Sequence, residues 1–531
     1  MQSVVATDPM IEVPKRTFDA IQSQLRDLQE RNAALAEQLA WFKRQVFGVK
    51  SEKRFEGSAD QANLFAAGQA PVVPGKGVTT VDVPAHRRQK HRTGNEVNDS
   101  GMRFGPDVPV REIVLPCPEL SGPDADRYEL VDHKVSLRLA RQPGSHVVLK
   151  YLRPVVRRKA DGAMTTVAAP LGVLDHAQVD VSFVAGMLVD KFVYHVPLYR
   201  QHQRLADEGI VLARSSLDAW ARYSIELLGP IAKAIWEGIL AGEHLKIDET
   251  PIKAGRTTTK DGPRIGQGKM KTGWLWPVLG ENGDIAFGYS DQRGALAVKA
   301  FLGEAYKGTI QTDGYKVYAD YAAKLPGCIH ALCWSHTRRA FLKAEASDKV
   351  AVGQALEMIR ALYAIERRLK ESASDDAMIF QIRHKESRPV VEKFFAWVDA
   401  QIQEPSLTPK SPLAKALAYA KEREAGLKVY LKDPWLDLDT NDLERALRVI
   451  PMGRKNWLFC SSETGAKQLS TIQTVLATCR RHDVDPYTYL VDVLQRINEW
   501  PASRVTELTP REWARRFKTN PLRSDLARTG Q

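Results

Sequence analysis

Residues 308–321 read GTIQTDGYKVYADY, and residues 244–252 read HLKIDETPI. In both stretches an apolar, β-like run stops at or close to an aspartate, Asp313 in the first and Asp248 in the second. Carboxylates that converge from strand ends are the ligands that divalent metal ions need when they act on phosphodiesters. The two stretches therefore predict an acidic site at one edge of a β-sheet.

Strand-like and helical patterns alternate on both sides of these two acids. Three β-like runs are spaced like an antiparallel meander, at residues 244–254, 273–280 and 284–292. A helix, the strand that ends at Asp313, a second helix and a fifth strand that enters a helix follow in that order. This order matches the ribonuclease H-like fold of polynucleotidyl transferases, an α/β fold. The first and fourth strands of such a sheet are neighbours, so we expect Asp248 and Asp313 to lie side by side.

Neighbouring carboxylates repel each other unless a cation or a proton relieves them, and a pair of Mg²⁺ ions can do so. Such ions activate the attacking water or hydroxyl and stabilise the leaving oxygen of an in-line displacement. Each acid taken alone also fits a loop-end cap or a surface charge, which is the commoner role of acidic residues in general.

A third acid, Glu444, opens a helical pattern in DTNDLERALRVIPMGRKNWLF, residues 439–459. Asn441 followed three residues later by Glu444 is a capping-box pattern, which would turn the carboxylate back toward the backbone. Asn441, Glu444 and Arg448 also share one helix face by their three- and four-residue spacing, which favours an active-site lip. The local pattern leaves both roles open for Glu444.

Basic side chains near the three acids are the candidate contacts to a DNA backbone. They are His336, Arg338, Arg339, Arg448, Arg454, Lys455, Lys269 and Lys271. Cys328 and Cys333 lie near His336, but no second Cys/His pair accompanies them, so a four-ligand zinc site is not supported. The sequence has no Walker A motif, no dinucleotide fingerprint and no G-x-S-x-G nucleophile elbow.

The whole chain of 531 residues is too long for a single core, and it carries a net charge of +12 with a pI near 9.3. The excess of Lys and Arg favours a polyanionic partner. No basic start followed by an apolar stretch marks a signal peptide, and no apolar segment reaches spanning length. The five cysteines are scattered, which suits a reducing compartment. We therefore expect a cytoplasmic, nucleoid-associated protein with no membrane partner.

The N-terminal half divides into four predicted segments. A heptad pattern at 16–50, with Asn32 at an a position, indicates a coiled coil that forms a homo-oligomer; an amphipathic helix packed on its own chain is the alternative. A flexible basic linker follows at 51–110, and a small β module at 111–175. Two helices at 180–240, the first ending at Gly209 and the second capped by Ser215 or Ser216, fit a helix-turn-helix, and equally any αα-hairpin.

The C-terminal half holds the α/β domain, predicted at 244–480. A nearly unbroken helical pattern at about 345–435 is inserted before the last elements of this domain, and a helical basic segment follows at 481–531. The predicted fold is thus multidomain α/β, with a ribonuclease H-like domain that carries a helical insertion.

Five motifs occur together in the order in which a known family has them. They are IDETPI, QTDGYKVYADY, CWSHTRRAF, NDLERALRVIPMGRKNWLF and DPYTYLVDVLQRI. With them the chain resembles the transposases of insertion-sequence-66 elements from about residue 180 to its end, and its helix at 18–50 resembles the family's leading coiled coil. The resemblance implies a DDE-type transposase in which Asp248, Asp313 and Glu444 form the catalytic, metal-binding triad and use two Mg²⁺ or Mn²⁺ ions.

The resemblance also implies cleavage of double-stranded DNA at transposon ends, joining of the freed 3′-hydroxyl to target DNA, and accessory proteins of the same element. Two other functions remain open: a DNA-binding protein that has lost catalysis on the same scaffold, and a nuclease that cuts without joining. The chain departs from the family at its small zinc module. The paired cysteines of that module are reduced to Cys117 in LPCPEL, which argues against zinc binding at 111–175.

Overall fold

The computed structural model describes residues 102–528 except 107, 122–124, 143, 171, 175–176, 257–269, 373–374 and 458–459. The predicted coiled coil at 16–50 and most of the predicted linker lie outside these residues. Within them, no helix is long and apolar enough to cross a membrane. The most apolar run of the sequence, at 179–193, instead forms helix α3 (Val181–Phe192), which is buried along most of its length.

A mixed sheet carries Asp248 and Asp313. Its described strands are β7 (His244–Ile247), β8 (Thr250–Arg256), β9 (Met270–Gly280), β10 (Ile285–Ser290), β11 (Gly308–Thr312) and β12 (Cys328–Leu332). Their spatial order is β10-β9-β7-β11-β12, with β8 also paired to β9. Strands β7, β9 and β10 form an antiparallel meander, and β11 lies parallel to both β7 and β12. The predicted meander and the predicted contact between the first and fourth strands are both confirmed.

The first predicted strand, residues 244–254, is two strands in the structure. Strand β7 ends at Ile247 and β8 begins at Thr250, and both pair antiparallel with β9. The interruption falls on Asp248 and Glu249. Pairing on either side therefore fixes the backbone of Asp248 while this residue itself stands outside the ladder.

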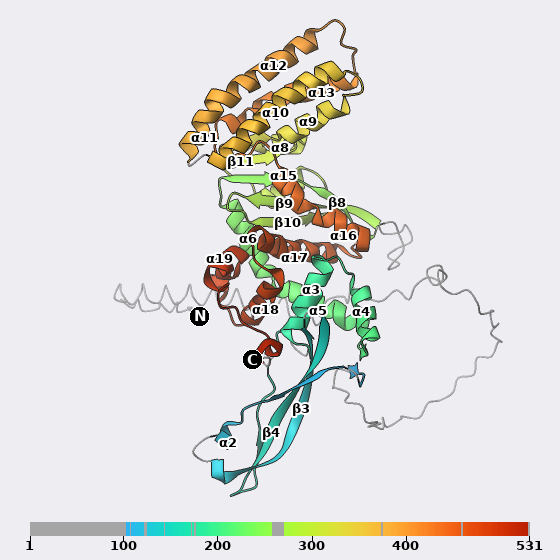
Figure 1. Cartoon of the computed structure of the whole chain (residues 1–531), viewed down its shortest axis with the longest axis vertical. Helices are drawn as coiled ribbons and strands as arrows, with labels where there is room; N and C mark the ends of the chain where they lie inside the picture. The colour runs from blue at the N-terminus through green and yellow to red at the C-terminus, as the bar shows by residue number, and fades with distance from the viewer. Residues whose placement is uncertain are drawn as a thin grey trace, which may run out of the picture. The chain divides into compact units, whose positions relative to one another are not determined.

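Helices pack on this sheet and link its strands (Figure 1). Helix α7 (Ala295–Leu302) connects β10 to β11, and α8 (Lys316–Ala322) connects β11 to β12. Helices α6 (Gly229–Leu240) and α17 (Glu463–Arg481) pack against β10. Side chains from the sheet and from these helices share one hydrophobic core.

Between β12 and the helix that carries Glu444, the chain forms a helical insertion with a hydrophobic core of its own (Figure 1). Trp334, Phe341 and Phe394 lie at the centre of that core. The helices are α9 (Trp334–Lys343), α10 (Lys349–Ser372), α11 (Asp376–Ile382), a π-helical segment (Arg383–Ser387), α12 (Arg388–Gln403), α13 (Pro412–Glu422), α14 (Glu424–Leu427) and a 3-10 turn (Val429–Leu431).

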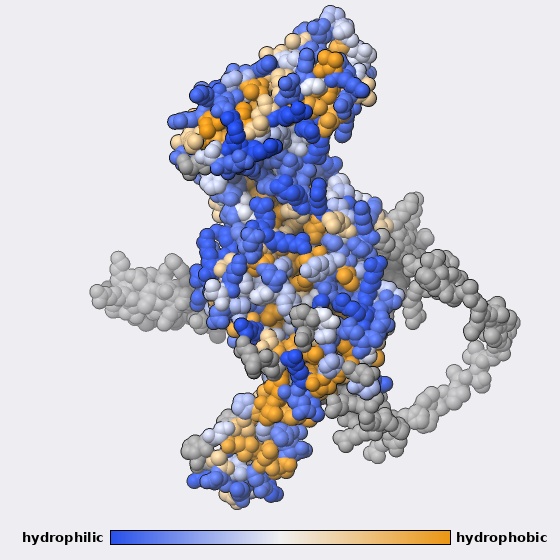
Figure 2. Space-filling model, viewed as in Figure 1, coloured by the Kyte–Doolittle hydropathy of each residue, from blue (hydrophilic) through white to orange (hydrophobic). Residues whose placement is uncertain are grey.

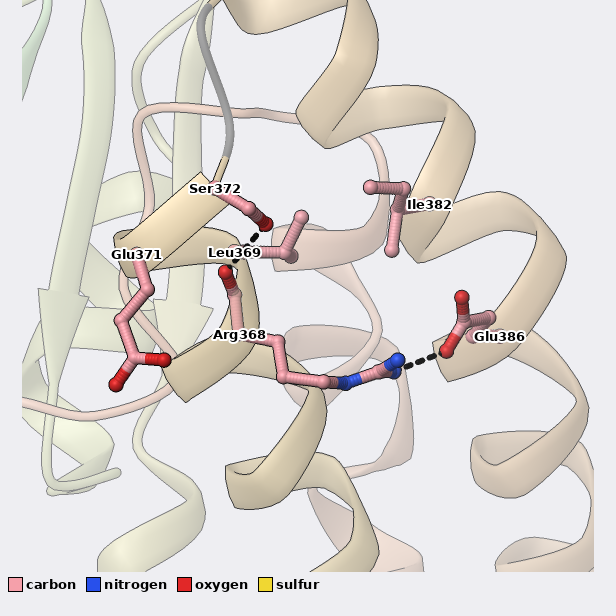
Figure 3. Close-up of a pocket in the computed structure, with 6 residues that line it drawn as sticks. All are labelled: Arg368, Leu369, Glu371, Ser372, Ile382 and Glu386. Atoms are coloured by element: carbon pink, nitrogen blue, oxygen red, sulfur yellow. Dashed lines mark hydrogen bonds and ion pairs between the residues drawn. The ribbon is translucent and has the colours of Figure 1, made fainter.

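A cavity of about 260 Å³ lies within the insertion, beside the end of α10 (Figure 3). Arg368 and Glu386 form an ion pair across it, and the Ser372 hydroxyl donates a 2.7 Å hydrogen bond to the Arg368 carbonyl. None of the predicted site residues lines this cavity, so it has no part in the acidic site.

The described chain begins with a small β region. Its main sheet has the order β2-β4-β3, with β5 paired to β4. The strands are β2 (Val110–Val114), β3 (Tyr128–Gln142), β4 (Ser145–Arg158) and β5 (Met164–Thr166), with α2 (Pro118–Ser121) and a 3-10 turn (Ala125–Arg127) between β2 and β3. Strands β3 and β4 form a long hairpin, over which hydrophobic residues gather at the surface (Figure 2).

Helices α3, α4 (Leu198–Asp207), α5 (Arg214–Leu227) and α6 follow. The predicted end of α4 at Gly209 is confirmed, since Gly209 has a φ of 79° directly after the helix. The short strand β6 (Ile210–Val211) then pairs with β1 (Arg103–Phe104). The expectation that Ser215 or Ser216 caps α5 is wrong, because the helix begins earlier and no side chain caps it.

The C-terminal elements are α15 (Asn441–Leu447), α16 (Val449–Trp457), α17, α18 (Pro486–Arg496), a 3-10 helix (Ala502–Leu508), α19 (Pro510–Arg516) and α20 (Asp525–Arg528). The buried carboxylate of Asp492 joins them, because it accepts hydrogen bonds from Arg496 and from the indole of Trp513 at 2.9 Å.

Candidate active site

Asp248 lies where β7 stops, held by the backbone on both sides. Its N–H donates a 3.3 Å hydrogen bond to the carbonyl of Pro277 on β9. One oxygen of its carboxylate accepts a 2.8 Å hydrogen bond from the N–H of Glu249. Leu245 and Ile247 are fully buried beneath it, which anchors the strand in the core. In the described part of the chain, no hydrogen bond or ion pair reaches the other carboxylate oxygen of Asp248, so this oxygen is available to a ligand.

Asp313 follows β11 directly. Strand β11 runs parallel to β7, with Gln311 opposite Lys246. Continuing this register by two residues sets Asp313 opposite Asp248. One oxygen of Asp313 accepts a 2.8 Å hydrogen bond from the N–H of Tyr315. The two aspartates thus stand at the same end of two adjacent strands, each with one carboxylate oxygen tied to a backbone N–H.

Glu444 is not used as a helix cap. The helix is preceded by Thr440, and the N–H of Asn441 donates to the carboxylate of Asp439 at 3.0 Å. The capping box left open by the sequence therefore does not form. Instead, the Glu444 carboxylate accepts a hydrogen bond from the Arg339 guanidinium on α9, and His336 lies 3.7 Å from the same oxygen.

Burial is the main cause that raises the pKa of Asp248 to about 7, and the negative charges of Glu249, Asp313 and Glu444 contribute to the same shift. The N–H of Glu249 acts in the opposite direction. The three predicted catalytic acids are therefore close enough for their charges to act on one carboxyl group. Perturbed pKa values of this kind cluster at functional sites, although structural ion pairs produce them as well.

The chemistry of these residues fits a hard divalent cation, although they do not form a finished cage. No three described His, Cys, Asp or Glu side chains are gathered closely enough to hold a metal ion. Asp248 and Asp313 supply carboxylate oxygens, and Mg²⁺ commonly binds through one or two carboxylates while it keeps several waters. Glu444 would join only by leaving Arg339. Among the described residues, the buried Nδ1 of His336 has no hydrogen-bond partner, so one polar atom of the residue beside Glu444 is left unsatisfied.

A fourth acidic residue, Glu249, lies beside Asp248 and was not among the site residues predicted from the sequence. Its side chain is almost fully buried and forms an ion pair with Arg293 at 2.6 Å, and it accepts a hydrogen bond from the Tyr318 hydroxyl. The Arg293 guanidinium lies over the rings of Trp274 and Tyr315. This cluster fixes the chain directly beside Asp248. The two consecutive acids in IDET, Asp248 and Glu249, are the sequence signal that could have predicted this cluster.

The structure brings only part of the predicted DNA-binding set to the acids. His336 and Arg339 contact Glu444, while Arg338, one residue away, is exposed. Of the remaining members, Arg454 bonds to the Pro251 carbonyl and Lys271 to Glu463 at 3.1 Å, Arg448 lines a separate cavity, Lys455 is exposed, and Lys269 lies outside the described residues. These eight residues therefore remain predicted DNA contacts.

The cysteines do not share a ligand. Cys117 is buried and its thiol donates a 3.2 Å hydrogen bond to Glu119, while burial raises the pKa of the Cys333 thiol above its usual range. Both are free thiols, as is Cys328.

Known protein families and proteins are similar to this chain in sequence. The chain matches the family model described as "Transposase IS66 family" over residues 176–468, "IS66 C-terminal element" over 474–511 and "Transposase C of IS166 homeodomain" over 34–110. The first match alone covers more than half of the chain. The chain belongs to the IS66 family of transposases. It is a transposase and, at the level of reaction class, a DDE-type polynucleotidyl transferase.

Similar proteins come from Sinorhizobium fredii. The uncharacterized protein y4hP is 29% identical over 76% of this chain and 75% of its own length. The uncharacterized protein y4jD is 26% identical over 90% of this chain and 94% of its own. Among solved structures, the Drosophila P element transposase strand transfer complex is similar at 11% identity and a TM-score of 0.33, over 58% of this chain and 93% of that one. A likeness of this size adds nothing to the fold assignment.

Proposed function

We propose that this transposase cleaves DNA at transposon ends and transfers the freed 3′ end to target DNA, with Asp248, Asp313 and Glu444 as its catalytic acids. The observation that carries the proposal is the register of β11 with β7, which sets Asp313 opposite Asp248 at the same sheet edge. Burial, with the charges of Glu249, Asp313 and Glu444 as smaller causes, raises the pKa of Asp248 to about 7. The strand order β10-β9-β7-β11-β12 supports a ribonuclease H-like catalytic domain, since β7, which precedes Asp248, is central and β11, which precedes Asp313, lies beside it.

Each acid has a distinct part. Asp248 and Asp313 would hold divalent cations through the oxygens that no backbone N–H occupies, and Glu444 would complete the set after leaving Arg339. A bound pair of Mg²⁺ or Mn²⁺ ions would activate the attacking water or hydroxyl and stabilise the leaving oxygen. The N–H groups of Glu249 and Tyr315 orient the two aspartates. The Arg339 guanidinium, once free of Glu444, is placed to bind a DNA phosphate.

The proposal includes the partners expected from the sequence. Double-stranded DNA of the ends and the target is the substrate, with end recognition by the helices of 180–240. The segment at 16–50 joins two or more copies of the chain, and accessory proteins of the same element complete the assembly. A basic chain of net charge +12 suits this substrate.

The test is to incubate the purified full chain with labelled element-end DNA and Mg²⁺ or Mn²⁺, and to follow both nicking and strand transfer. Asp248→Asn, Asp313→Asn and Glu444→Gln should each lose both steps and keep DNA binding. Asp320→Asn, an exposed acid on α8, is the matched control and should cleave normally.

Each other outcome selects another function. Binding by the unaltered chain without any cleavage would indicate an inactive DNA-binding protein, and cleavage without joining would indicate a nuclease. Normal cleavage by Glu444→Gln would remove Glu444 from the catalytic set.

A further inference from the structure

A cavity of about 880 Å³ opens where the end of α3 meets α15, α16 and α17. Its volume lies within the roughly 300–1,000 Å³ that is usual for ligand pockets. Phe192 and Leu476 are buried at its lining, and the Gln473 amide donates a 3.1 Å hydrogen bond to the Phe192 carbonyl. None of the three proposed catalytic acids lines this cavity, so it is a separate site.

Arginines dominate the lining of this cavity. Arg445, Arg448, Arg480 and Arg481 all line it and are exposed. Within the described chain, no carboxylate forms an ion pair with any of the four. The acid in the lining, Asp442, is already neutralised, because its carboxylate lies 2.9 Å from the Nζ of Lys246. Of the four, Arg481 donates a 3.2 Å hydrogen bond to the Gly283 carbonyl. Guanidinium groups without a carboxylate partner bind phosphates through paired N–H donors, so a phosphate-bearing polyanion fits this lining.

Two large apolar side chains stand at the same cavity. Tyr194 is 68% exposed and Met452 is 54% exposed. Tyr194 lies in the turn after α3, where the next residue, His195, has a left-handed φ of 60° that non-glycine residues seldom adopt. The backbone thus accepts strain at the turn that presents an aromatic ring to solvent.

An exposed aromatic ring beside phosphate-binding groups is the arrangement with which proteins bind unpaired nucleotides. The arginines engage the backbone, and the ring stacks on the face of a base. A duplex keeps its base faces stacked on one another, so a single exposed tyrosine gains little from it. The charge and the ring together favour a single strand.

We propose that this cavity, the arginine groove, binds single-stranded DNA, with Arg445, Arg448 and Arg480 on phosphates and Tyr194 stacked on a base. The inference rests on the proposed function, because cleavage at an element end is what would supply an unpaired strand. Helix α15 carries Glu444 and Arg445, and Arg448 follows its last residue directly, so this helix would link the groove to the catalytic acids.

The test measures fluorescence anisotropy of a labelled oligothymidylate of about 15 nucleotides with the full chain, against a duplex of equal length. Tyr194→Ala should weaken oligothymidylate binding about 5- to 100-fold, and Tyr194→Phe should restore it, since stacking needs only the ring. Tyr199→Ala, which alters another exposed tyrosine, on α4 and outside the groove, is the matched control and should bind normally.

Charge is tested separately through salt dependence. Arg445→Ala and Arg480→Ala should each lower the slope of log Kd against log salt concentration by about 0.7 for a single strand. Arg360→Ala, an exposed arginine on α10, should leave that slope unchanged. All of these side chains are exposed, and an unchanged Tm would show that each variant is folded.

Unchanged oligothymidylate binding by Tyr194→Ala would overturn the groove assignment, as would tighter binding of the duplex with the same sensitivity to Tyr194. Asp248→Asn separates this inference from the proposed function. That variant should bind oligothymidylate normally and fail to cleave. Cleavage by Asp248→Asn would refute the catalytic proposal alone, whereas loss of the Tyr194 effect would refute the groove alone.

Discussion

The hydroxyl of Tyr419, on α13, donates a 3.0 Å hydrogen bond to the backbone carbonyl of Asp313. Arg423, one turn later, donates a 3.2 Å bond to the carbonyl of Gly314 and lies 3.7 Å from the centroid of the Tyr419 ring. Gly314 has a φ of 93°, and a Cβ there would lie 2.7 Å from the Arg423 Nε. The helical insertion therefore holds the turn that presents a proposed catalytic acid.

Tyr419→Phe should lower the kcat of DNA cleavage by about fivefold, because it removes one hydrogen bond of about 1 kcal/mol that positions Asp313. The ring that supports Arg423 stays, so we expect KM for DNA to change less than the rate does. Single-turnover cleavage at saturating DNA measures this effect. Tyr199→Phe is the control, and a rise in KM with an unchanged kcat would contradict the positioning role.

Arg339→Gln should tighten Mn²⁺ binding to the DNA-free chain by up to about fivefold, since it frees Glu444 from an ion pair worth no more than about 1 kcal/mol at this exposure. Electron paramagnetic resonance of Mn²⁺ measures the free ion directly. Arg338→Gln, the exposed neighbour on α9, should have no effect. In a Glu444→Gln background the Arg339 substitution should also lose its effect, and a persistent effect there would show that Arg339 acts through another group.

Asp248→Asn should stabilise the metal-free chain at alkaline pH. The folded pKa of Asp248 is about 7 against an ordinary value of 3.8, so the unfolded chain binds fewer protons between these values and stability falls as pH rises through that window. The substitution should raise the free energy of unfolding by up to about 4 kcal/mol near pH 8, and the gain should vanish near pH 4.

Urea unfolding in a chelator at several pH values measures this gain for Asp248→Asn. Asp320→Asn serves as the control because its carboxylate is exposed. A constant difference across the pH range would place the pKa of Asp248 outside the window.

His244→Gln should destabilise the chain at neutral pH. The ring donates to Asp433 at 2.7 Å and to Glu281 at 2.9 Å, and the bond to Asp433 is the main cause that raises the pKa of His244 to about 9. This contribution is fully present below the ordinary value of 6.5 and is lost as pH rises through about 9. We expect a loss of about 2 kcal/mol near pH 7.

Chemical unfolding near neutral pH and near pH 10 measures the loss caused by His244→Gln. His384→Gln, on the surface of the insertion, is the matched control. An equal loss at both pH values would show that packing, rather than charge, explains the effect.

Local patterns were sufficient to predict the two aspartates. Alternating apolar residues and a following Gly314 predict a strand that stops at Asp313, and the strand order then sets Asp248 beside it. These are consequences of the backbone over a few residues.

The surroundings of Glu444 could not be read in this way. Its partner Arg339 lies on α9, more than 100 residues earlier in the chain. The capping box does not form because the Asn441 N–H donates to Asp439 instead of to Glu444. The arginine groove also depends on contacts between distant segments, since Tyr194 after α3 and Arg480 on α17 line one cavity only in the folded chain. Single-sequence periodicity carries no information about such contacts.

The helical insertion separates the third proposed acid from the first two along the chain, and it has a core of its own. During synthesis, a chain that has emerged through β12 already holds both aspartates, whereas Glu444 arrives only after the whole insertion has followed. On the proposed triad, a nascent or truncated chain is therefore unable to cut the DNA of its own cell. On that triad, the order of the elements leaves the site incomplete until the insertion has been synthesised.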